Sequence, residues 1–231
     1  MERGLYIAAS GMLSEMVRQD QIANDLANAS TPGYKADKAT QRSFGDILLS
    51  NSVTGQTVGP LGLGSHIDSI VTDTTPAPAR QTGEPLDFAV QGDGWFSVQT
   101  PQGVRYTRNG QFGISPQGTL VDSLGNQVLG QNGGPVAVGA NGKADPRQIG
   151  LFTLTGVRKV GDSYVTGAAA GGRSTGTIEQ GALESSNANP AHSMVDMIAS
   201  FRAFESGQRV IRTIDETLQK ASNSVGGLPG A

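Results

Sequence analysis

The two ends of the chain constrain its fold most, because each carries apolar residues at the spacing of an amphipathic helix. Near the N-terminus these residues recur at alternating steps of four and three positions between residues 5 and 26. Near the C-terminus they share one helical face between residues 194 and 218. Both faces are narrow and include polar side chains such as Gln19 and Asp215. Helices with narrow apolar faces need partner helices to complete their burial, as in coiled coils.

These two faces predict the surfaces through which the helices pack. Two long amphipathic helices can form a hairpin within one monomer, and this is the general expectation for such a pair. The narrow faces instead favour contacts with helices of neighbouring subunits. The predicted interface residues are Leu5, Ala9, Met12, Met16, Ile22 and Leu26 in the N-terminal helix and Met194, Met197, Ile198, Phe201, Phe204, Ile211, Ile214 and Leu218 in the C-terminal helix.

Proline and glycine mark the ends of these helices. The first helix is expected to stop at residues 28–33, which include a Pro-Gly pair that removes a backbone donor and permits a left-handed turn. Asn189 followed by Pro190 is typical of an N-cap and a first helical position. The second helix should run to about residue 221. Gly207 lies inside it, at a cost of about 1 kcal/mol relative to alanine.

Between the helices the apolar period changes to two, which indicates β-strands. Residues 86–90 alternate, and residues 92–94 then form a Gly-Asp-Gly turn. The Asn-Gly pair at residues 109–110 is a strong signal for a tight hairpin. Frequent turn residues and short strands predict an all-β domain. Its core is expected to include Phe88, Trp95, Phe112 and Phe152.

The segments on either side of this domain are rich in glycine and small residues. Residues 50–80 should be extended or irregular, and residues 166–177 should form a flexible loop. The predicted fold class is therefore α+β, with N- and C-terminal coiled-coil-like helices flanking a central all-β domain. The predicted divisions are an N-terminal polymerisation helix (1–30), an extended connecting segment (31–79), the central β domain (80–177), a return segment (178–189) and a C-terminal polymerisation helix (190–225).

Charge and composition exclude several classes of function. The formal net charge is −3, so no basic field is available to hold nucleic acid or an anionic membrane surface. The chain has no cysteine, which excludes disulfides, thiolate metal sites and cysteine nucleophiles. We expect no cleaved secretory signal and no membrane span, because no apolar run is long enough for either.

Residues that could carry chemistry lack the neighbours that a site needs. His66 and His192 have no motif around them, and Asp87 and Asp93 have turn positions rather than calcium-binding spacing. We therefore expect no enzyme activity, no cofactor, no metal and no small-molecule substrate. The main alternative is a secreted carbohydrate-binding β-domain module, with Trp95 and Tyr106 as an exposed platform. An enzyme would need a pocket with perturbed carboxylates around Asp87, Asp93 or Asp122.

Several blocks of the sequence form a recognisable set. They are Gly-Met at 11–12, QIANDLAN at 21–28, STPGYK at 30–35, PLDFAVQGDGWF at 85–96, YTRNGQF at 106–112 and GALESSN at 181–187. The most specific feature is an Asn-x-Leu-Ala-Asn core in the first helix followed by a Thr-x-Gly-aromatic-Lys turn. In these blocks the sequence resembles the flagellar basal-body rod and hook protein family.

The resemblance implies a structural protein of a helical assembly. Such subunits are exported by the flagellar type III apparatus and assemble head to tail outside the inner membrane, in the periplasm or cell wall, with other rod and hook subunits. Their terminal helices form the inner tube of the basal body. The short segment between Leu49 and Gly64 favours a proximal rather than a distal rod subunit.

Overall fold

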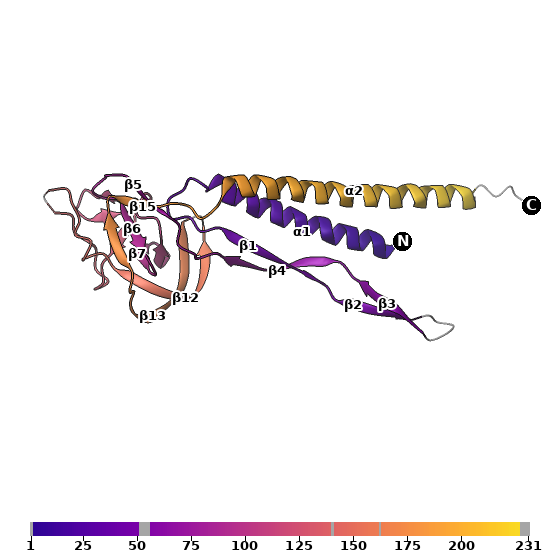
Figure 1. The fold of residues 1–231 in the computed structure, drawn as a ribbon, viewed down its shortest axis with the longest axis horizontal. Helices are drawn as coiled ribbons and strands as arrows, with labels where there is room; N and C mark the ends of the chain where they lie inside the picture. The colour runs from indigo at the N-terminus through magenta and orange to yellow at the C-terminus, as the bar shows by residue number, and fades with distance from the viewer. Residues whose placement is uncertain (1, 51–55, 140, 162, 227–231) are drawn as a thin grey trace, which may run out of the picture. The chain divides into compact units, whose positions relative to one another are not determined.

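The computed structural model describes residues 2–50, 56–139, 141–161 and 163–226 (Figure 1). Within these residues it has helices α1 (Glu2–Ala27) and α2 (Pro190–Gly226) at the two ends and β-strands between them. This arrangement confirms the predicted α+β class, in which two helices flank a β-rich domain. The strands are β1 (Asp37–Ser43), β2 (Asp46–Ser50), β3 (Thr57–Gly62), β4 (Ser65–Thr72), β5 (Ala79–Gln81), β6 (Phe88–Gln91), β7 (Trp95–Thr100), β8 (Gly103–Thr107), β9 (Gly113–Ile114), β10 (Leu120–Val121), β11 (Gln127–Leu129), β12 (Leu151–Val160), β13 (Tyr164–Arg173), β14 (Thr177–Gln180) and β15 (Ala182–Glu184).

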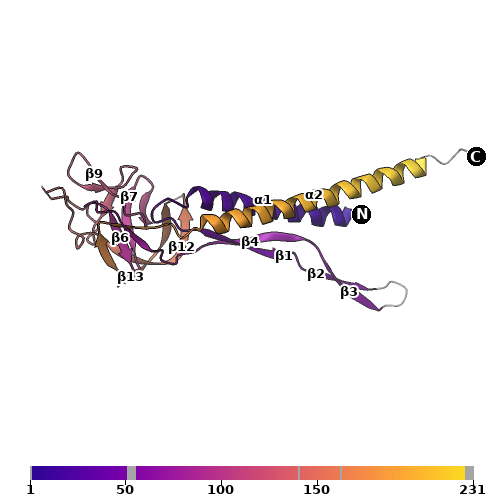
Figure 2. The same ribbon diagram turned by 45° about the horizontal axis from the view of Figure 1, so that its top comes forward.

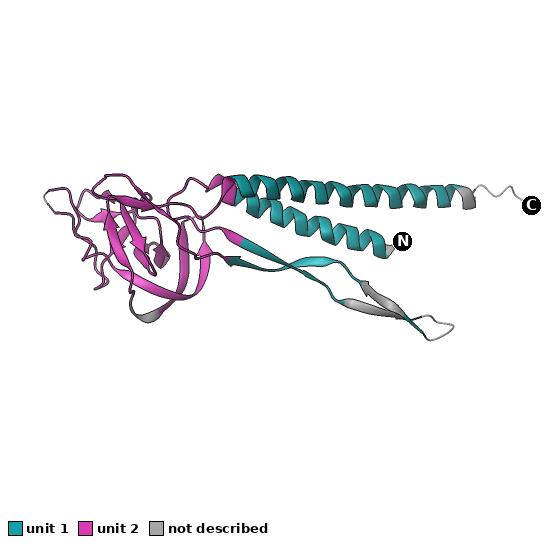
Figure 3. Ribbon diagram, viewed as in Figure 1, with its two compact units in different colours: residues 1–24, 38–71, 191–231 teal, residues 25–37, 72–190 magenta. Residues whose placement is uncertain are grey.

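The chain divides into two compact units that do not follow its sequence order (Figure 3). The helical unit contains described residues of 1–24, 38–71 and 191–226, and the β unit contains described residues of 25–37 and 72–190. The turn after α1 is therefore part of the β unit. Tyr34 and Lys35, which follow this turn, are almost fully buried.

Both helices begin or end where the sequence indicates. α1 stops at Ala27, and Gly33 in the following turn has a φ of 67°, a left-handed conformation that suits glycine. α2 begins at Pro190, as predicted from the Asn-Pro pair, and continues to Gly226. The helix is thus five residues longer than the expected end at residue 221.

Within the helical unit, α1 and α2 pack closely in antiparallel directions. A Cβ added to Gly4 would contact Ile214, and a Cβ added to Gly207 would lie 2.7 Å from Cγ of Met12. The cost of Gly207 to helix propensity is thus offset by close packing of the two helices at this point.

A two-stranded β ribbon completes the helical unit. β1 pairs with β4, and β2 pairs antiparallel with β3, so that the second pair continues the ribbon (Figures 1 and 2). Residues 50–80 were expected to be extended or irregular, and the described part of this segment contains the extended strands β3 and β4. Main-chain pairing and an anchor on α1 stabilise this segment: Ser14 donates a hydrogen bond to the carbonyl oxygen of Ser65, and the Ser65 amide donates to Oγ of Ser10.

The β unit is organised around one seven-stranded sheet with the strand order β12-β13-β8-β7-β11-β10-β9. The first residues of β7 also pair with β12, so β7, β8, β13 and β12 form a closed ring of pairings. Two smaller antiparallel pairs, β6 with β14 and β5 with β15, bring the C-terminal end of the unit back onto its beginning. This return places residues 182–187 beside residues 33–36 and 73–78.

Three of the four aromatic residues expected in the core of the β unit are buried: Phe88, Trp95 and Phe112. Phe88 and Phe112 belong to the main buried cluster, together with Phe96, which packs edge-on against Phe112. Trp95 is buried outside this cluster, with the Arg108 guanidinium over its ring. Phe152 is only half-buried and packs against the ring of Tyr106.

Two local predictions in this unit are wrong, because strand pairing and backbone contacts decide the structure there. Residues 166–177 do not form a loop: most of them lie in β13, which pairs with β12. The pair at residues 109–110 does not form a hairpin either, since β8 pairs with β7 and β9 pairs with β10. Gly110 instead lies against the backbone of Phe88, where an added Cβ would be 1.7 Å from its carbonyl oxygen.

Candidate assembly interface

The predicted interface residues divide into two groups by exposure. Eight are buried or half-buried: Ala9, Met12, Ile22, Leu26, Met197, Phe204, Ile211 and Ile214. Six are exposed: Leu5, Met16, Met194, Ile198, Phe201 and Leu218. The structure thus supplies partners within the chain for the first group and leaves the second group facing outward.

The exposed group is part of wider apolar faces on both helices. On α2, Met194, Ile198 and Phe201 follow the spacing of one helical face, and the last two are 54% and 52% exposed. On α1, Leu13 is 64% exposed, and Val17 follows one turn later. Five further apolar residues are also exposed but lie outside the single narrow face predicted for each helix: Tyr6, Leu13, Val17, Val195 and Val210.

A shallow groove of about 390 Å³ lies between α1 and α2. Its lining residues are mostly small: Gly4, Ala8, Gly11, Ala203, Ser206 and Gly207 are among them. A Cβ added to Gly11 would meet no atom within 4 Å, so this position is open in the single chain. Glu15 is the one ionisable group among the lining residues, and it accepts a hydrogen bond from Ser200. A groove with a small-residue floor can accept a bulky apolar side chain.

The turn that follows α1 is locked into the β unit by its backbone. The amide of Gly33 donates a hydrogen bond of 2.8 Å to the carbonyl oxygen of Glu184. A Cβ on Gly33 would lie 2.2 Å from the carbonyl carbon of Arg108. The glycine of the Thr-Pro-Gly-Tyr-Lys segment is therefore required both for its left-handed conformation and for this close approach.

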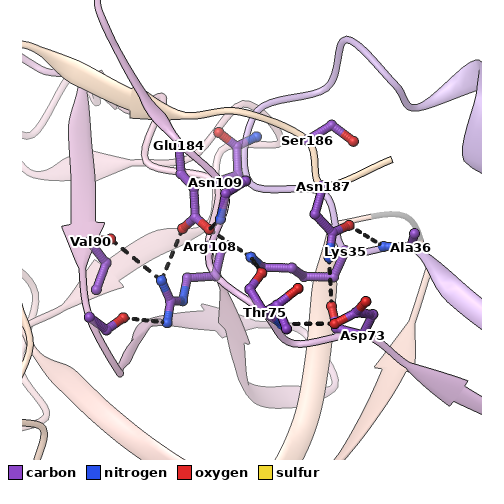
Figure 4. Close-up of polar contacts among 12 residues, drawn as sticks. Lys35, Ala36, Asp73, Thr75, Val90, Arg108, Asn109, Glu184, Ser186 and Asn187 are labelled. Atoms are coloured by element: carbon purple, nitrogen blue, oxygen red, sulfur yellow. Dashed lines mark hydrogen bonds and ion pairs between the residues drawn. The ribbon is translucent and has the colours of Figure 1, made fainter. Parts of the chain in front are cut away.

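Glu184 joins two buried cations from distant parts of the chain (Figure 4). Nζ of Lys35 donates to Oε1 of Glu184 at 2.6 Å, and Nη1 of Arg108 donates to Oε2 at 3.0 Å. The Ala77 amide also donates to Oε1, and Nζ of Lys35 reaches the carbonyl oxygen of Thr75. The side chains of all three charged residues are at most 2% exposed. Burial lowers the pKa of Lys35, although the pairing with Glu184 opposes this shift.

A second set of hydrogen bonds surrounds this ion cluster. The side chain of Asn187 accepts from the Ala36 amide and donates to the carbonyl oxygen of Asp73 (Figure 4). Tyr34 donates to Asp25, whose pKa is raised by burial and partly restored by that hydrogen bond. The residues of this cluster lie in blocks that resemble a family, but their spacing does not predict the contacts among them. The one local signal for a buried charge is Glu184, which follows two apolar residues in the short strand β15.

The residues considered for catalysis or ligand binding do not come together in one catalytic or ligand-binding site. His66 stacks on Phe44 in the ribbon, and His192 lies in α2. Among the described residues no group of three His, Asp or Glu side chains could hold a metal ion. Trp95 is only 5% exposed and Tyr106 is half-buried, so they do not form the exposed platform that the binding-module alternative requires.

Asp122, the remaining candidate carboxylate, accepts a hydrogen bond from the hydroxyl of Tyr164. Burial and this contact raise the pKa of Tyr164 to about 12 from an ordinary value of 10.0. A raised folded-state pKa gives stability that is fully present below pH 10 and is lost as pH rises toward 12.

We therefore expect native protein to be more stable than Tyr164→Phe at about pH 8, with a smaller difference near pH 12. Urea midpoints measure this, and a pH-independent difference would contradict it.

No helix in the described part of the chain is long and apolar enough to cross a bilayer.

Three family profiles match the sequence, and together they span most of it. "Flagella basal body rod protein" matches residues 5–35, "Flagellar hook protein FlgE/F/G D1 domain" matches residues 89–150, and "Flagellar basal body rod FlgEFG protein C-terminal" matches residues 179–224. The three matches lie on α1 and its turn, on the β unit, and on the return strands with α2.

Individual relatives match over nearly their whole length. The flagellar basal-body rod protein FlgG of Bacillus subtilis (strain 168) is 33% identical, covering 96% of this chain and 99% of the relative. FlgF of Rhizobium meliloti (strain 1021) is 33% identical over 98% and 99% of the two chains. FlgF of Salmonella typhimurium is 31% identical over 96% and 98%. With helices at both ends, a β-rich middle and matches across its whole length, the chain belongs to the flagellar basal-body rod protein family.

Proposed function

We propose that this chain is a structural subunit of the flagellar rod, which assembles head to tail into a helical tube and transmits motor torque. The observation that carries the proposal is the outward apolar face on both terminal helices. A subunit that stayed monomeric would keep Ile198, Phe201 and Leu13 in water, at an unfavourable hydrophobic free energy. Contacts between different surfaces of identical subunits, when they do not close into a ring, generate helical tubes.

In this proposal each helix has two roles. The inward residues, such as Met12, Phe204 and Ile211, hold α1 and α2 together within a subunit. The outward residues pack against helices of neighbouring copies, in a coiled-coil-like layer, with segments 1–30 and 190–225 as the polymerisation helices. The groove between α1 and α2 offers a place for one bulky side chain of a neighbour. Other rod and hook subunits would continue the same layer at the two ends.

The remaining features of the proposal concern location and chemistry. The chain would be exported by the flagellar type III apparatus and would act in the basal body, outside the inner membrane. We propose no enzymatic activity, which agrees with the structural role of the family. Relatives named FlgF and relatives named FlgG match this chain almost equally well, so their identities favour no rod position. The preference for a proximal position therefore rests on the short sequence between Leu49 and Gly64.

The groove provides a direct test of this function. Gly11→Leu places a side chain where the single chain has open space, and leucine favours helix, so the monomer should fold normally. The added side chain fills the groove, so we expect loss of swimming and incomplete basal bodies. Melting of the purified monomer by circular dichroism should be unchanged.

Gly134→Leu is the matched control, because Gly134 lies in the β unit and also has open space around it. It should leave both melting and swimming intact. Normal swimming and complete basal bodies in cells that make only Gly11→Leu would show that the groove receives nothing from a neighbouring subunit.

A further inference from the structure

The β unit is closed by its own last segment. β14 pairs with β6, and β15 pairs with β5, so residues 177–184 complete two sheets whose other strands lie much earlier in the chain. Glu184 then contacts Lys35 across 149 positions and Arg108 across 76 positions. The return segment therefore carries the carboxylate that the earlier segments need.

The charges make this dependence strong. Lys35 and Arg108 are both buried, and burial, with a smaller contribution from the nearby guanidinium, lowers the pKa of Lys35. Among the described residues, the carboxylate of Glu184 pairs with both cations. Without it, folding would bury two like charges near each other. Removing one member of a buried ion pair is strongly destabilising, because the remaining charge stays uncompensated.

Glu184 also accepts hydrogen bonds from two main-chain amides. Its carbonyl oxygen accepts the Gly33 amide, and its carboxylate accepts the Ala77 amide. Glu184 thus satisfies donors from the turn after α1 and from the segment before β5, besides the two cations. Until Glu184 arrives, water is the available partner for these groups, and they are more favourable outside the core.

We propose that Glu184 is a folding interlock: the β unit cannot close around Lys35 and Arg108 until the return segment, residues 177–187, has docked. The consequence goes beyond assembly. A chain that passes through a narrow channel from its N-terminus would stay open until nearly all of it had passed. This consequence rests on the proposed export, whereas the folding order itself does not.

Trp95 makes the interlock measurable, since it is the only tryptophan and lies buried beneath the Arg108 guanidinium. Refolding of the full chain can be followed by Trp95 fluorescence, and docking of β15 by pulsed hydrogen exchange at its amides. In the native protein the two signals should rise together. In the charge-free variant Lys35→Met/Arg108→Met/Glu184→Leu, Trp95 burial should precede β15 protection by about tenfold in rate, because no charge delays closure.

Equilibrium measurements give a second readout on the full chain. Glu184→Gln keeps the size and hydrogen-bonding oxygen but removes the charge, so trypsin cleavage after Lys35 and Arg108 should accelerate about tenfold or more. Glu179→Gln is the matched control: Glu179 lies on the adjacent strand β14 and accepts hydrogen bonds from Gln81 and Gln91 rather than from a cation. Its cleavage rate should stay native.

Two outcomes would overturn the interlock. One is simultaneous Trp95 burial and β15 protection in the charge-free variant, at the native rate. The other is native trypsin resistance in Glu184→Gln. If Glu184→Gln does not fold, the charge-free variant still decides the question, because buried ion pairs replaced as a whole by apolar residues generally retain stability. All readouts use the purified monomer, so they are independent of whether the chain assembles into a rod.

Discussion

Gly33→Ala should destabilise the β unit by at least about 3 kcal/mol and lower its melting temperature by several degrees. Alanine in a left-handed conformation costs roughly 1 to 2 kcal/mol by itself. The larger part comes from the clash of its Cβ with the backbone of Arg108, which cannot rotate away as a side chain could. The turn would have to leave its site, and the Gly33–Glu184 hydrogen bond and the burial of Lys35 would be lost with it.

Gly118→Ala separates the two contributions. Gly118 also has a positive φ, of 75°, but an added Cβ would meet no atom within 4 Å. Gly118→Ala should therefore lower the free energy of unfolding only by the cost of alanine in a left-handed conformation, about 1 to 2 kcal/mol. Thermal and urea unfolding of both variants measure the difference. Equal stability of Gly33→Ala and Gly118→Ala would show that the turn is not held against Arg108.

The double change Ile198→Ala/Phe201→Ala should stop rod growth and abolish swimming while leaving monomer melting within about 1 kcal/mol of native stability. Both side chains are more than half exposed in the single chain, so little intramolecular packing is lost. In the proposed assembly they are buried at every subunit added. Truncation of a buried phenylalanine costs about 3 to 5 kcal/mol, and this cost would recur along the rod.

Two comparisons make this result specific to the helices. Ile114→Ala/Leu124→Ala removes two apolar side chains of the β unit that are 48% and 74% exposed, and it should leave swimming intact. Phe204→Ala, by contrast, removes a half-buried side chain from the inward face of α2, so it should weaken both the monomer and its assembly. Swimming by cells that make only Ile198→Ala/Phe201→Ala would exclude this face from the rod.

Local sequence signals were sufficient for the helices, because both their periodicity and their ends are encoded by neighbouring residues. Pro190 begins α2, and the Pro-Gly pair at residues 32–33 follows the end of α1. The same kind of signal failed at Gly110, where a glycine typical of a tight turn serves a contact with Phe88 instead. It failed again for β13, since a strand of small residues is stabilised by its pairing with β12.

The candidate interface was predictable in part. Helical spacing identified Ile198 and Phe201, and the outward direction of these side chains depends on which face α1 already covers. The ion cluster could not be derived from spacing, because Lys35 and Glu184 lie 149 positions apart and no local pattern pairs them. Likewise, the ribbon from β1 to β4 depends on main-chain pairing and on serine contacts with α1, which composition does not reveal.

Electron cryomicroscopy of basal bodies purified from cells that make this chain tests the central claim most directly. The account predicts repeated copies of this chain along the rod, with the outward residues of α1 and α2, including Leu13, Ile198 and Phe201, packed against helices of neighbouring subunits. A complete rod that lacks this chain would contradict the account. So would a rod in which these side chains of the bound chain face solvent.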